Sequence, residues 1–164
     1  MELATFNQLS ADEAQAAIRH CVAIPHWQQA LVAARPFAST EALLATADAL
    51  AREWQQPELE TALSAHPRIG ERAKGADKEA ALSRGEQSAM QQADHALQRA
   101  MQKGNEEYEA RFGRVFLIRA KGRSGEQMMA ELQRRLQNSD IAEQQEALDQ
   151  LREITLLRLK ETMQ

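Results

Sequence analysis

The stretch Asp140–Met163, DIAEQQEALDQLREITLLRLKETM, decides the fold class, because it predicts one long amphipathic helix. It consists mostly of strong helix formers and contains neither glycine nor proline. Its apolar residues recur every three or four positions, as in a helix with one buried face: Ala147, Leu148, Leu151 and Ile154. Arg158 follows Leu151 by seven residues, or two helical turns, so we expect its side chain to point the same way.

Helix signals continue through the rest of the chain. Pro25 interrupts a first helix, Pro57 suits the first turn of a short one, and Ser39 or Thr40 can cap another. Three capping boxes predict further helix starts: Ser10 with Glu13, Ser83 with Glu86, and Ser124 with Gln127. The predicted helices cover residues 11–20, a segment with Trp27 and Leu31, a segment from Leu43 to Trp54, and residues 57–66, 83–103, 105–111, 124–136 and 140–163.

Two stretches depart from this pattern. Residues 70–82 are polar and contain Gly70 and Gly75, which predicts a surface loop with at most a helical turn. Val115–Ile118 is strand-like, but four residues without a partner cannot make a sheet, so we expect an extended buried connector. The prediction is an all-α fold, a single-domain helical bundle of about seven to nine helices with one short extended connector.

Composition narrows the class of protein. The 164 residues, 43% hydrophobic and 27% charged, suit one globular domain over residues 1–164. The net charge of −4, without a basic patch, argues against a nucleic-acid partner, and the single Cys21 excludes an intramolecular disulfide. We find no apolar run of the ~20 residues that span a bilayer, no signal peptide and no peroxisomal tripeptide. We therefore expect a cytoplasmic protein without a membrane partner.

Polar side chains at predicted helix ends are the candidates for a site. Arg158 and Glu86 fall on inward-facing stripes, where a charge needs a partner or a ligand. His66 offers an acid/base group and Gln87 an amide. Together these four residues make a plausible site, although they do not indicate which substrate it binds.

Each candidate also has a purely structural interpretation. Arg158 can extend to solvent at the end of its helix, and Glu86 can be only the capping-box partner of Ser83. Gln87 is then a surface residue, and His66 closes a helix. Taken singly, these interpretations are the stronger ones.

Other chemistries lack their sequence signals. The four histidines give no HExxH, and no glutamate precedes a histidine by three residues, so no metal site is predicted. GxSxG, Walker and GxGxxG motifs are also absent. Cys21 lies on an apolar face, which favours a core residue over a nucleophile.

Four segments, in their order and spacing, resemble the OHCU decarboxylase family, named for 2-oxo-4-hydroxy-4-carboxy-5-ureidoimidazoline (OHCU). They are AHPRIG at 65–70, SRGEQ at 83–87, NEEYEARFGRVFLI at 105–118, and the closing segment from Glu146 to Arg158. The similarity begins with FNQLSADEA at residue 6, includes Trp27 and the segment RPFAS, and covers nearly the whole chain. HPRIG followed by SxxEQ and NxxYxxRFGxxF is a specific combination, whereas an HP dipeptide alone is not.

This resemblance implies an all-helical enzyme, usually a homodimer, that converts OHCU to (S)-allantoin in urate degradation without a cofactor or metal. It implies that His66 is the catalytic acid/base and that Glu86 works beside it. Family members often have Asp where Arg68 stands and Leu where Ile69 stands, so we assign Arg68 no role. The substrate-binding residues that the resemblance implies are Pro67, Ser83, Arg84, Gly85, Glu86, Gln87, Phe116, Leu117, Ile118, Arg119, Ala120 and Arg158.

The residue types suit that reaction. The leaving carboxylate of OHCU is one carbon away from a ring C=N, so the substrate carries its own electron sink. A guanidinium and an amide suit its ureido and carbonyl groups, and Glu86 can orient His66 and favour its protonated form.

Two alternatives remain open. One is another cofactor-free lyase or tautomerase that acts on a related ureide, which product analysis would distinguish. The other is a non-catalytic helical interaction module, in which Arg158 and Glu86 make an interhelical ion pair that apolar residues could replace.

Overall fold

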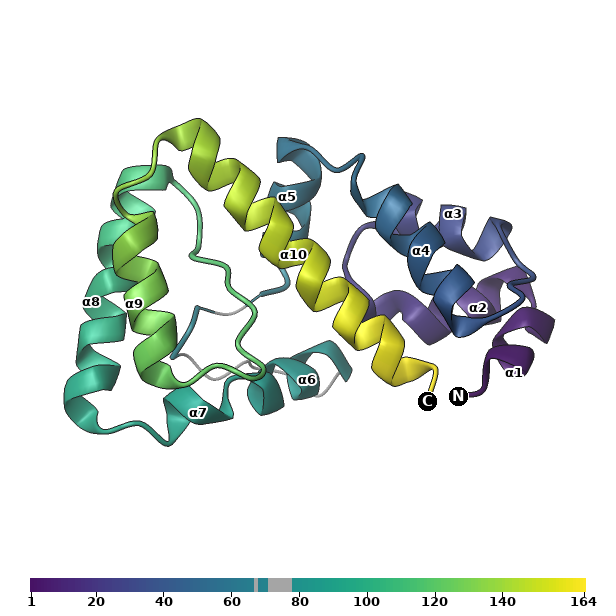
Figure 1. Cartoon of the computed structure of the whole chain (residues 1–164), viewed down its shortest axis with the longest axis horizontal. Coiled ribbons are helices and arrows are strands. Elements are labelled where there is room, and N and C mark those ends of the chain that lie inside the picture. Colours follow the sequence, from purple (N-terminus) through teal and green to yellow (C-terminus); the bar gives the residue numbers. More distant parts are fainter. Residues whose placement is uncertain (67, 71–77) are drawn as a thin grey trace. The chain divides into compact units, whose positions relative to one another are not determined.

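The structure of the chain, a computed structural model, describes residues 1–66, 68–70 and 78–164. Over these residues it consists of ten α-helices and one short 3-10 helix, without any strand, which confirms the predicted all-α class (Figure 1). None of its helices is long and apolar enough to cross a membrane, within the residues described. The elements are α1 (Leu3–Gln8), α2 (Ala11–Ile18), η1 (Arg19–Cys21), α3 (Pro25–Ala33), α4 (Thr40–Ala51), α5 (Gln56–Leu63), α6 (Lys78–Glu86), α7 (Ser88–Gln91), α8 (His95–Phe112), α9 (Gly125–Arg135) and α10 (Asp140–Thr162).

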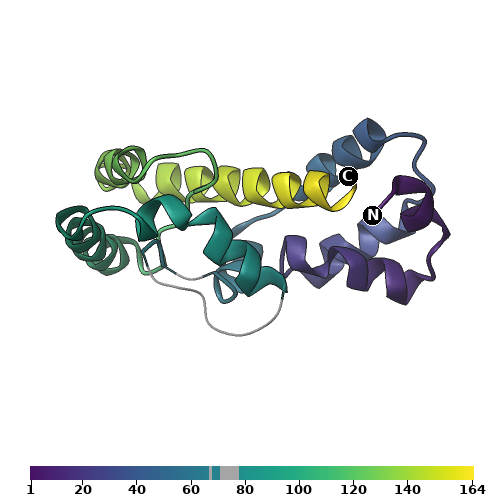
Figure 2. The same ribbon diagram turned by 90° about the horizontal axis from the view of Figure 1, so that it is seen from below.

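The chain divides into two compact units. The first consists of Met1–Ala62 and Arg152–Gln164, and the second of Leu63–Leu151. Helix α10 is unbroken, as Figure 2 shows in yellow-green to yellow, and contributes its first part to the second unit and its last part to the first. The expected single domain over residues 1–164 stays a prediction.

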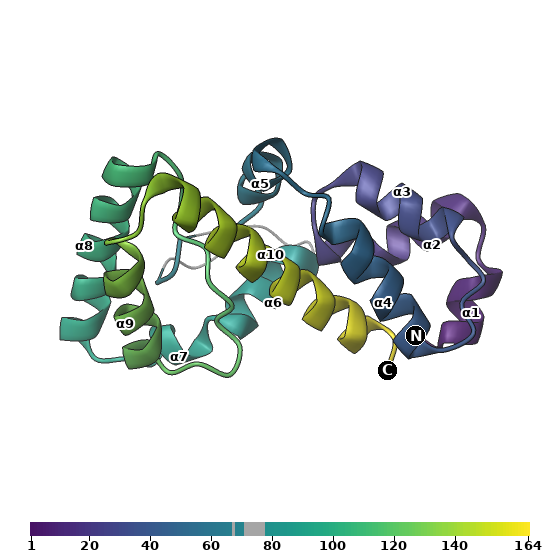
Figure 3. The same cartoon turned by 45° about the horizontal axis from the view of Figure 1, so that its top comes forward.

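The first unit is closed by contacts between segments that are distant in sequence. The Arg35 guanidinium donates to the carbonyls of Phe6 (2.7 Å) and Leu9 (2.8 Å), and Asn7 and Phe37 exchange two hydrogen bonds of 3.0 Å. The terminal amine donates to the carbonyl of Thr162 at 2.9 Å, and Figure 3 shows the two chain ends together. The RPFAS segment therefore has a structural role in this unit.

The interior of the first unit contains two tryptophans. Trp27 and Trp54 are both buried and meet edge to face, with ring centroids 6.1 Å apart. The Trp27 indole N–H donates to the Ala47 carbonyl at 3.1 Å, which joins α3 to α4. Cys21 is fully buried, so the prediction that it belongs to the core is confirmed.

The second unit is built on α8 and α9, which run side by side (Figures 1 and 3). Gly104 allows this close approach, because a Cβ atom there would lie 2.5 Å from Cδ2 of Leu132. The helices share an apolar core whose members come from the whole unit: Ile69, Met90, Met101, Tyr108, Phe116, Ile118, Ala120, Met128 and Leu132.

A buried ionic network crosses this core. Arg135 and Glu143 are 1% and 0% exposed, and Arg135 Nε lies 3.0 Å from Glu143 Oε1. The Tyr108 hydroxyl donates to Glu143, and burial, reinforced by this hydrogen bond, raises the pKa of Tyr108. Removing one partner of such a buried pair typically costs about 3–5 kcal/mol, because the other charge stays uncompensated. The network therefore fixes α9 against the start of α10.

Most predicted helix boundaries are confirmed. The Ser10 and Ser124 hydroxyls accept from the N–H groups of Glu13 and Gln127, whose side chains return the bond, so both capping boxes are present. The Ser39 hydroxyl caps α4 by accepting from the Ala42 N–H at 3.1 Å. Helix α1 was not predicted.

The predicted helices around residues 83–111 are wrong in three respects. Ser83 lies inside α6 and does not cap it, so this helix begins within the stretch predicted as a surface loop. The expected helix 83–103 is broken after α7, and Asp94 caps α8 by accepting from the Leu97 N–H at 2.8 Å. Gly104 does not end a helix but lies within α8.

Candidate active site

His66 lies in the turn that follows α5. Its N–H donates to the Leu63 carbonyl at 3.1 Å, a contact that ends the helix. The residue is partly buried, and its Nε2 atom is shielded from solvent. We refer to residues 64–66 and 68–70 as the His66 loop. Pro67, which was also predicted to bind substrate, lies outside the described residues.

Ser83–Glu86 of the SRGEQ segment form the end of α6, and Gln87 follows it. Ser83 and Gln87 are buried, Arg84 and Glu86 are partly buried, and Gly85 is exposed. The Gln87 N–H donates to the Ser83 carbonyl at 3.1 Å, so the helical turn continues through Glu86. The capping-box interpretation of Glu86 is therefore wrong, and the stripe that was expected to join it to Met90 is interrupted by the end of α6.

Gln87 joins α6 to the His66 loop. Its Oε1 accepts from the Gly70 N–H at 3.1 Å, and the side chain is only 5% exposed. Gly70 has φ +94°, a conformation that strains any residue with a Cβ, which explains a glycine here. The structure thus brings the end of the SRGEQ motif to the end of the AHPRIG motif.

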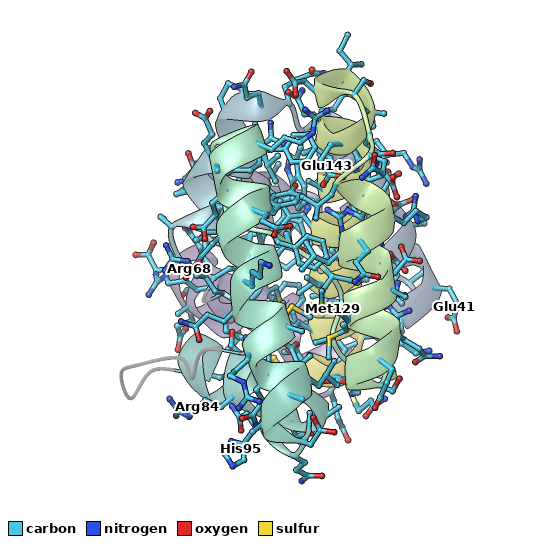
Figure 4. All side chains as sticks on the ribbon, turned by 90° about the vertical axis from the view of Figure 1, so that its left-hand side faces the viewer. Glu41, Arg68, Arg84, His95, Met129 and Glu143 are labelled. Carbon is cyan, nitrogen blue, oxygen red and sulfur yellow. The ribbon has the colours of Figure 1, made fainter. Side chains whose placement is uncertain are left out.

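The loop is also held from α8. Asn105 Nδ2 donates to the Ile69 carbonyl at 2.7 Å, and Arg68 Nε lies 3.0 and 2.9 Å from the two carboxylate oxygens of Glu109. Figure 4 shows Arg68 on the side of α8 away from Met129, a residue of α9 that lies between the two helices. These contacts were not predicted, although an asparagine inside a helix is a signal, because its intrinsic helix propensity is low.

The stretch Phe116–Ala120 is neither helical nor part of a sheet, and it overlaps the connector that was predicted at Val115–Ile118. Its Leu117 carbonyl accepts from Arg135 Nη1 at 2.8 Å, and its Arg119 N–H donates to Gln150 Oε1 at 2.8 Å. Phe116, Leu117, Ile118 and Ala120 are buried, whereas Arg119 is partly buried and donates from Nη1 to the Lys121 carbonyl. Phe116, Ile118 and Ala120 belong to the same core as Ile69 of the His66 loop.

Arg158 belongs to the first unit. It is 1% exposed, as are Ala147 and Leu148 of the predicted stripe, so the expectation of an inward-pointing arginine is confirmed. Its Nη1 donates to the His20 carbonyl at 3.3 Å. This burial contradicts the interpretation that the Arg158 side chain extends to solvent at the end of its helix.

The described parts of these elements provide acid/base, hydrogen-bonding and cationic groups. Ser83, Gln87 and Arg158 are polar side chains that the fold keeps almost entirely from water, and the burial of such groups has to be compensated by hydrogen bonds. Among the residues that the structure describes, no group of three or more His, Cys, Asp or Glu side chains could hold a metal ion.

Comparisons with known proteins agree on one family. The family model described as OHCU decarboxylase matches residues 7–160. A 2-oxo-4-hydroxy-4-carboxy-5-ureidoimidazoline decarboxylase of Haloferax volcanii is 30% identical over 128 residues, which cover 77% of this chain and 74% of the relative.

Solved structures share the fold. A crystal structure of OHCU decarboxylase in the presence of (S)-allantoin has a TM-score of 0.75 at 23% identity, and covers 88% of this chain and 95% of its own. A crystal structure of (S)-allantoin synthase has a TM-score of 0.74 at 16% identity. It covers 99% of this chain, which corresponds to 54% of its own length.

Proposed function

The chain belongs to the OHCU decarboxylase family, and from this membership we propose that it decarboxylates OHCU to (S)-allantoin with its own side chains and no cofactor. The observation that carries the proposal is the family match over residues 7–160, nearly the whole chain. The hydrogen bond between Gln87 and Gly70 supports it, because it joins two of the motifs on which the family resemblance rests.

The proposed roles follow from side-chain chemistry. His66 is the acid/base group, and Glu86 orients it and favours its charged form. The substrate carboxylate and ureido group are polar and flat, so we assign their binding to the Arg158 guanidinium and the Gln87 amide. We propose that Ser83, Arg84, Gly85, Pro67 and the stretch Phe116–Ala120 complete the binding site.

The reaction needs few groups from the protein. When the bond to the carboxylate breaks, its electron pair moves towards the adjacent ring C=N, whose nitrogen takes up a proton. Protonation of the ring carbon that bears the ureido group then creates the stereocentre, while the hydroxyl group on the neighbouring ring carbon loses its proton and becomes the carbonyl of allantoin. An enzyme that holds the intermediate and delivers this proton to one face gives a single enantiomer.

Two further features belong to this proposal. We propose that the protein works as a homodimer, as the family resemblance implies, and that it acts in the cytoplasm. Light scattering during size-exclusion chromatography tests the first, and fractionation of the source cells tests the second. A monomer at working concentration would contradict the proposed assembly.

The deciding experiment supplies freshly generated OHCU and follows its decay together with the circular dichroism of the product. We expect decay faster than the spontaneous reaction and an excess of (S)-allantoin. His66→Asn is the matched variant, and it should fold normally but lose roughly 10²–10⁴-fold in turnover. Racemic allantoin at the background rate with the wild-type protein would overturn the proposal, and another product would favour a different ureide lyase.

A further inference from the structure

Three consecutive residues of the His66 loop are each fixed by a side chain from elsewhere in the second unit. Arg68 pairs with Glu109, the Ile69 carbonyl accepts from Asn105, and the Gly70 N–H donates to Gln87. The first two contacts come from α8, where Asn105 and Glu109 are four residues apart and so share one face. One helix face therefore determines the course of the backbone two residues after His66.

We propose that Asn105 is a positioning residue for the decarboxylation: by holding the Ile69 carbonyl it fixes the chain that carries His66, with the Arg68–Glu109 pair as an auxiliary contact. The inference rests on the proposed function, because it takes His66 as the catalytic group. Gln87 and Arg158 were assigned to the substrate, whereas Asn105 acts only through the loop.

The bond made by Asn105 has the features of a strong contact. The Nδ2–O distance is 2.7 Å, and Asn105 is 3% exposed. The Ile69 side chain is itself buried, at 6% exposure, in the core with Met90 and Met101. Ile69 is thus held at both its side chain and its carbonyl. A buried carbonyl that loses its donor is expensive, so the loop has to move to find another.

The sequence also favours a specific role for this residue. Asparagine is a poor helix former because its side chain competes for backbone hydrogen bonds, yet Asn105 lies in the interior of α8. Donation to a carbonyl outside the helix explains its presence there. Since a carbonyl can only accept, the amide nitrogen must face Ile69.

The ion pair is the weaker contact. The Arg68 and Glu109 side chains are 45% and 24% exposed. Both line an open cavity of about 670 Å³ beside α8, so water reaches them and screens the charges. The Arg68–Glu109 pair therefore contributes less to the position of the loop than the Asn105 hydrogen bond does.

The first test is Asn105→Asp, which keeps the size of the side chain but faces the Ile69 carbonyl with an acceptor. We expect kcat to fall about ten- to hundred-fold, because a misplacement of about 1 Å can cost that much. KM should stay within about three-fold, since the proposed role of Asn105 is to hold the loop and not to bind the substrate. Hydrogen exchange at residues 68–70 should become faster. Glu107→Gln, an exposed change on the same helix, is the control and should leave both constants unchanged.

The second test uses the ion pair and serves also if Asn105→Asp fails to fold. Arg68→Glu and Glu109→Arg should each lower kcat about two- to five-fold, and the double variant should return to within two-fold of wild type. Unchanged kcat in a folded Asn105→Asp protein would overturn the inference, as would a loss of activity explained entirely by a smaller folded fraction. If Asn105→Asp does not fold, single ion-pair variants with wild-type kcat overturn it.

The two proposals fail in different ways. If His66→Asn keeps full turnover while Asn105→Asp still loosens residues 68–70, the catalytic role of His66 is wrong, and Asn105 only stabilises a loop. If His66→Asn is inactive while folded Asn105→Asp is fully active, the proposed function stands and the positioning role is wrong.

Discussion

Glu86 is the last residue of α6, and this position separates its structural from its catalytic interpretation. A capping box requires the serine to precede the helix, whereas Ser83 lies inside it. We therefore predict that Glu86→Gln keeps a near-native Tm but loses roughly 10²–10⁴-fold in turnover, because an amide cannot exchange a proton. Thermal unfolding and steady-state kinetics on the same preparation test this, with Glu107→Gln as the control. Full activity would remove Glu86 from the site.

Arg158 gives a second prediction at the residue scale. Lysine keeps the positive charge but loses the planar fork that can hold a carboxylate or ureido group through two parallel bonds. One hydrogen bond to a charged group contributes about 1.5–3 kcal/mol, so Arg158→Lys should raise KM roughly ten- to hundred-fold. Arg99→Lys, at an exposed position of α8, is the matched control. A Lys variant with the wild-type KM and kcat would rule out recognition through two bonds.

At the scale of elements, Arg134 joins α9 to α10. It lies 2.6 Å from Oε2 of Glu131 in its own helix and 2.6 Å from Oε1 of Glu146 in α10. Hydrogen bonds from Arg134 are the main cause that lowers the pKa of both carboxyl groups from the ordinary 4.5. The pairs are partly exposed, at 52% for Arg134, so each contributes within about 1 kcal/mol.

Because Arg134 lowers the pKa of these two carboxyl groups, its contribution to the stability of the folded protein should depend on pH. A carboxyl group whose pKa is lower in the folded protein stabilises it above the unfolded value, and this contribution disappears as the pH falls through the folded value. Arg134→Gln should therefore lower Tm at pH 7, and the gap to wild type should narrow below about pH 4.5. Arg99→Gln removes the same charge at an exposed position and serves as reference. An equal gap at pH 3 and pH 7 would show that Arg134 acts by packing and not by charge.

The elements also show what local sequence can predict. The caps at Ser10, Ser39 and Ser124 were predictable because each lies within three residues of its partner. The end of α6 at Glu86 was missed, since the Ser83–Lys103 stretch has helical periodicity throughout. Asp94 was the available signal for a new start, because an aspartate before an apolar helix is a preferred cap.

At the scale of the whole molecule, the sequence proposes candidate site residues but does not predict the contacts that hold them. The family motifs pointed to His66, Glu86 and Gln87, but the bonds that hold the loop join residues far apart in sequence. Gln87 contacts Gly70 across 17 positions, and Asn105 contacts Ile69 across 36. The helical periodicity of the sequence does not predict such pairings, because they depend on how α6, α8 and the loop pack together. The burial of Arg158, in contrast, followed from its place on the stripe of α10.

The last prediction concerns the complete protein and its reaction. The electron pair released with CO₂ has an acceptor in the substrate's own C=N bond, and in the proposed function Arg158 binds the substrate and His66 transfers the proton. We therefore predict that exhaustive treatment with a chelator leaves kcat, KM and the excess of (S)-allantoin unchanged. Elemental analysis of the treated protein by mass spectrometry must accompany the kinetics, so that activity is compared with measured metal content. Loss of turnover that one added metal restores would contradict a reaction carried by side chains alone. Loss of enantiomeric excess at unchanged turnover would instead assign the metal to the final protonation.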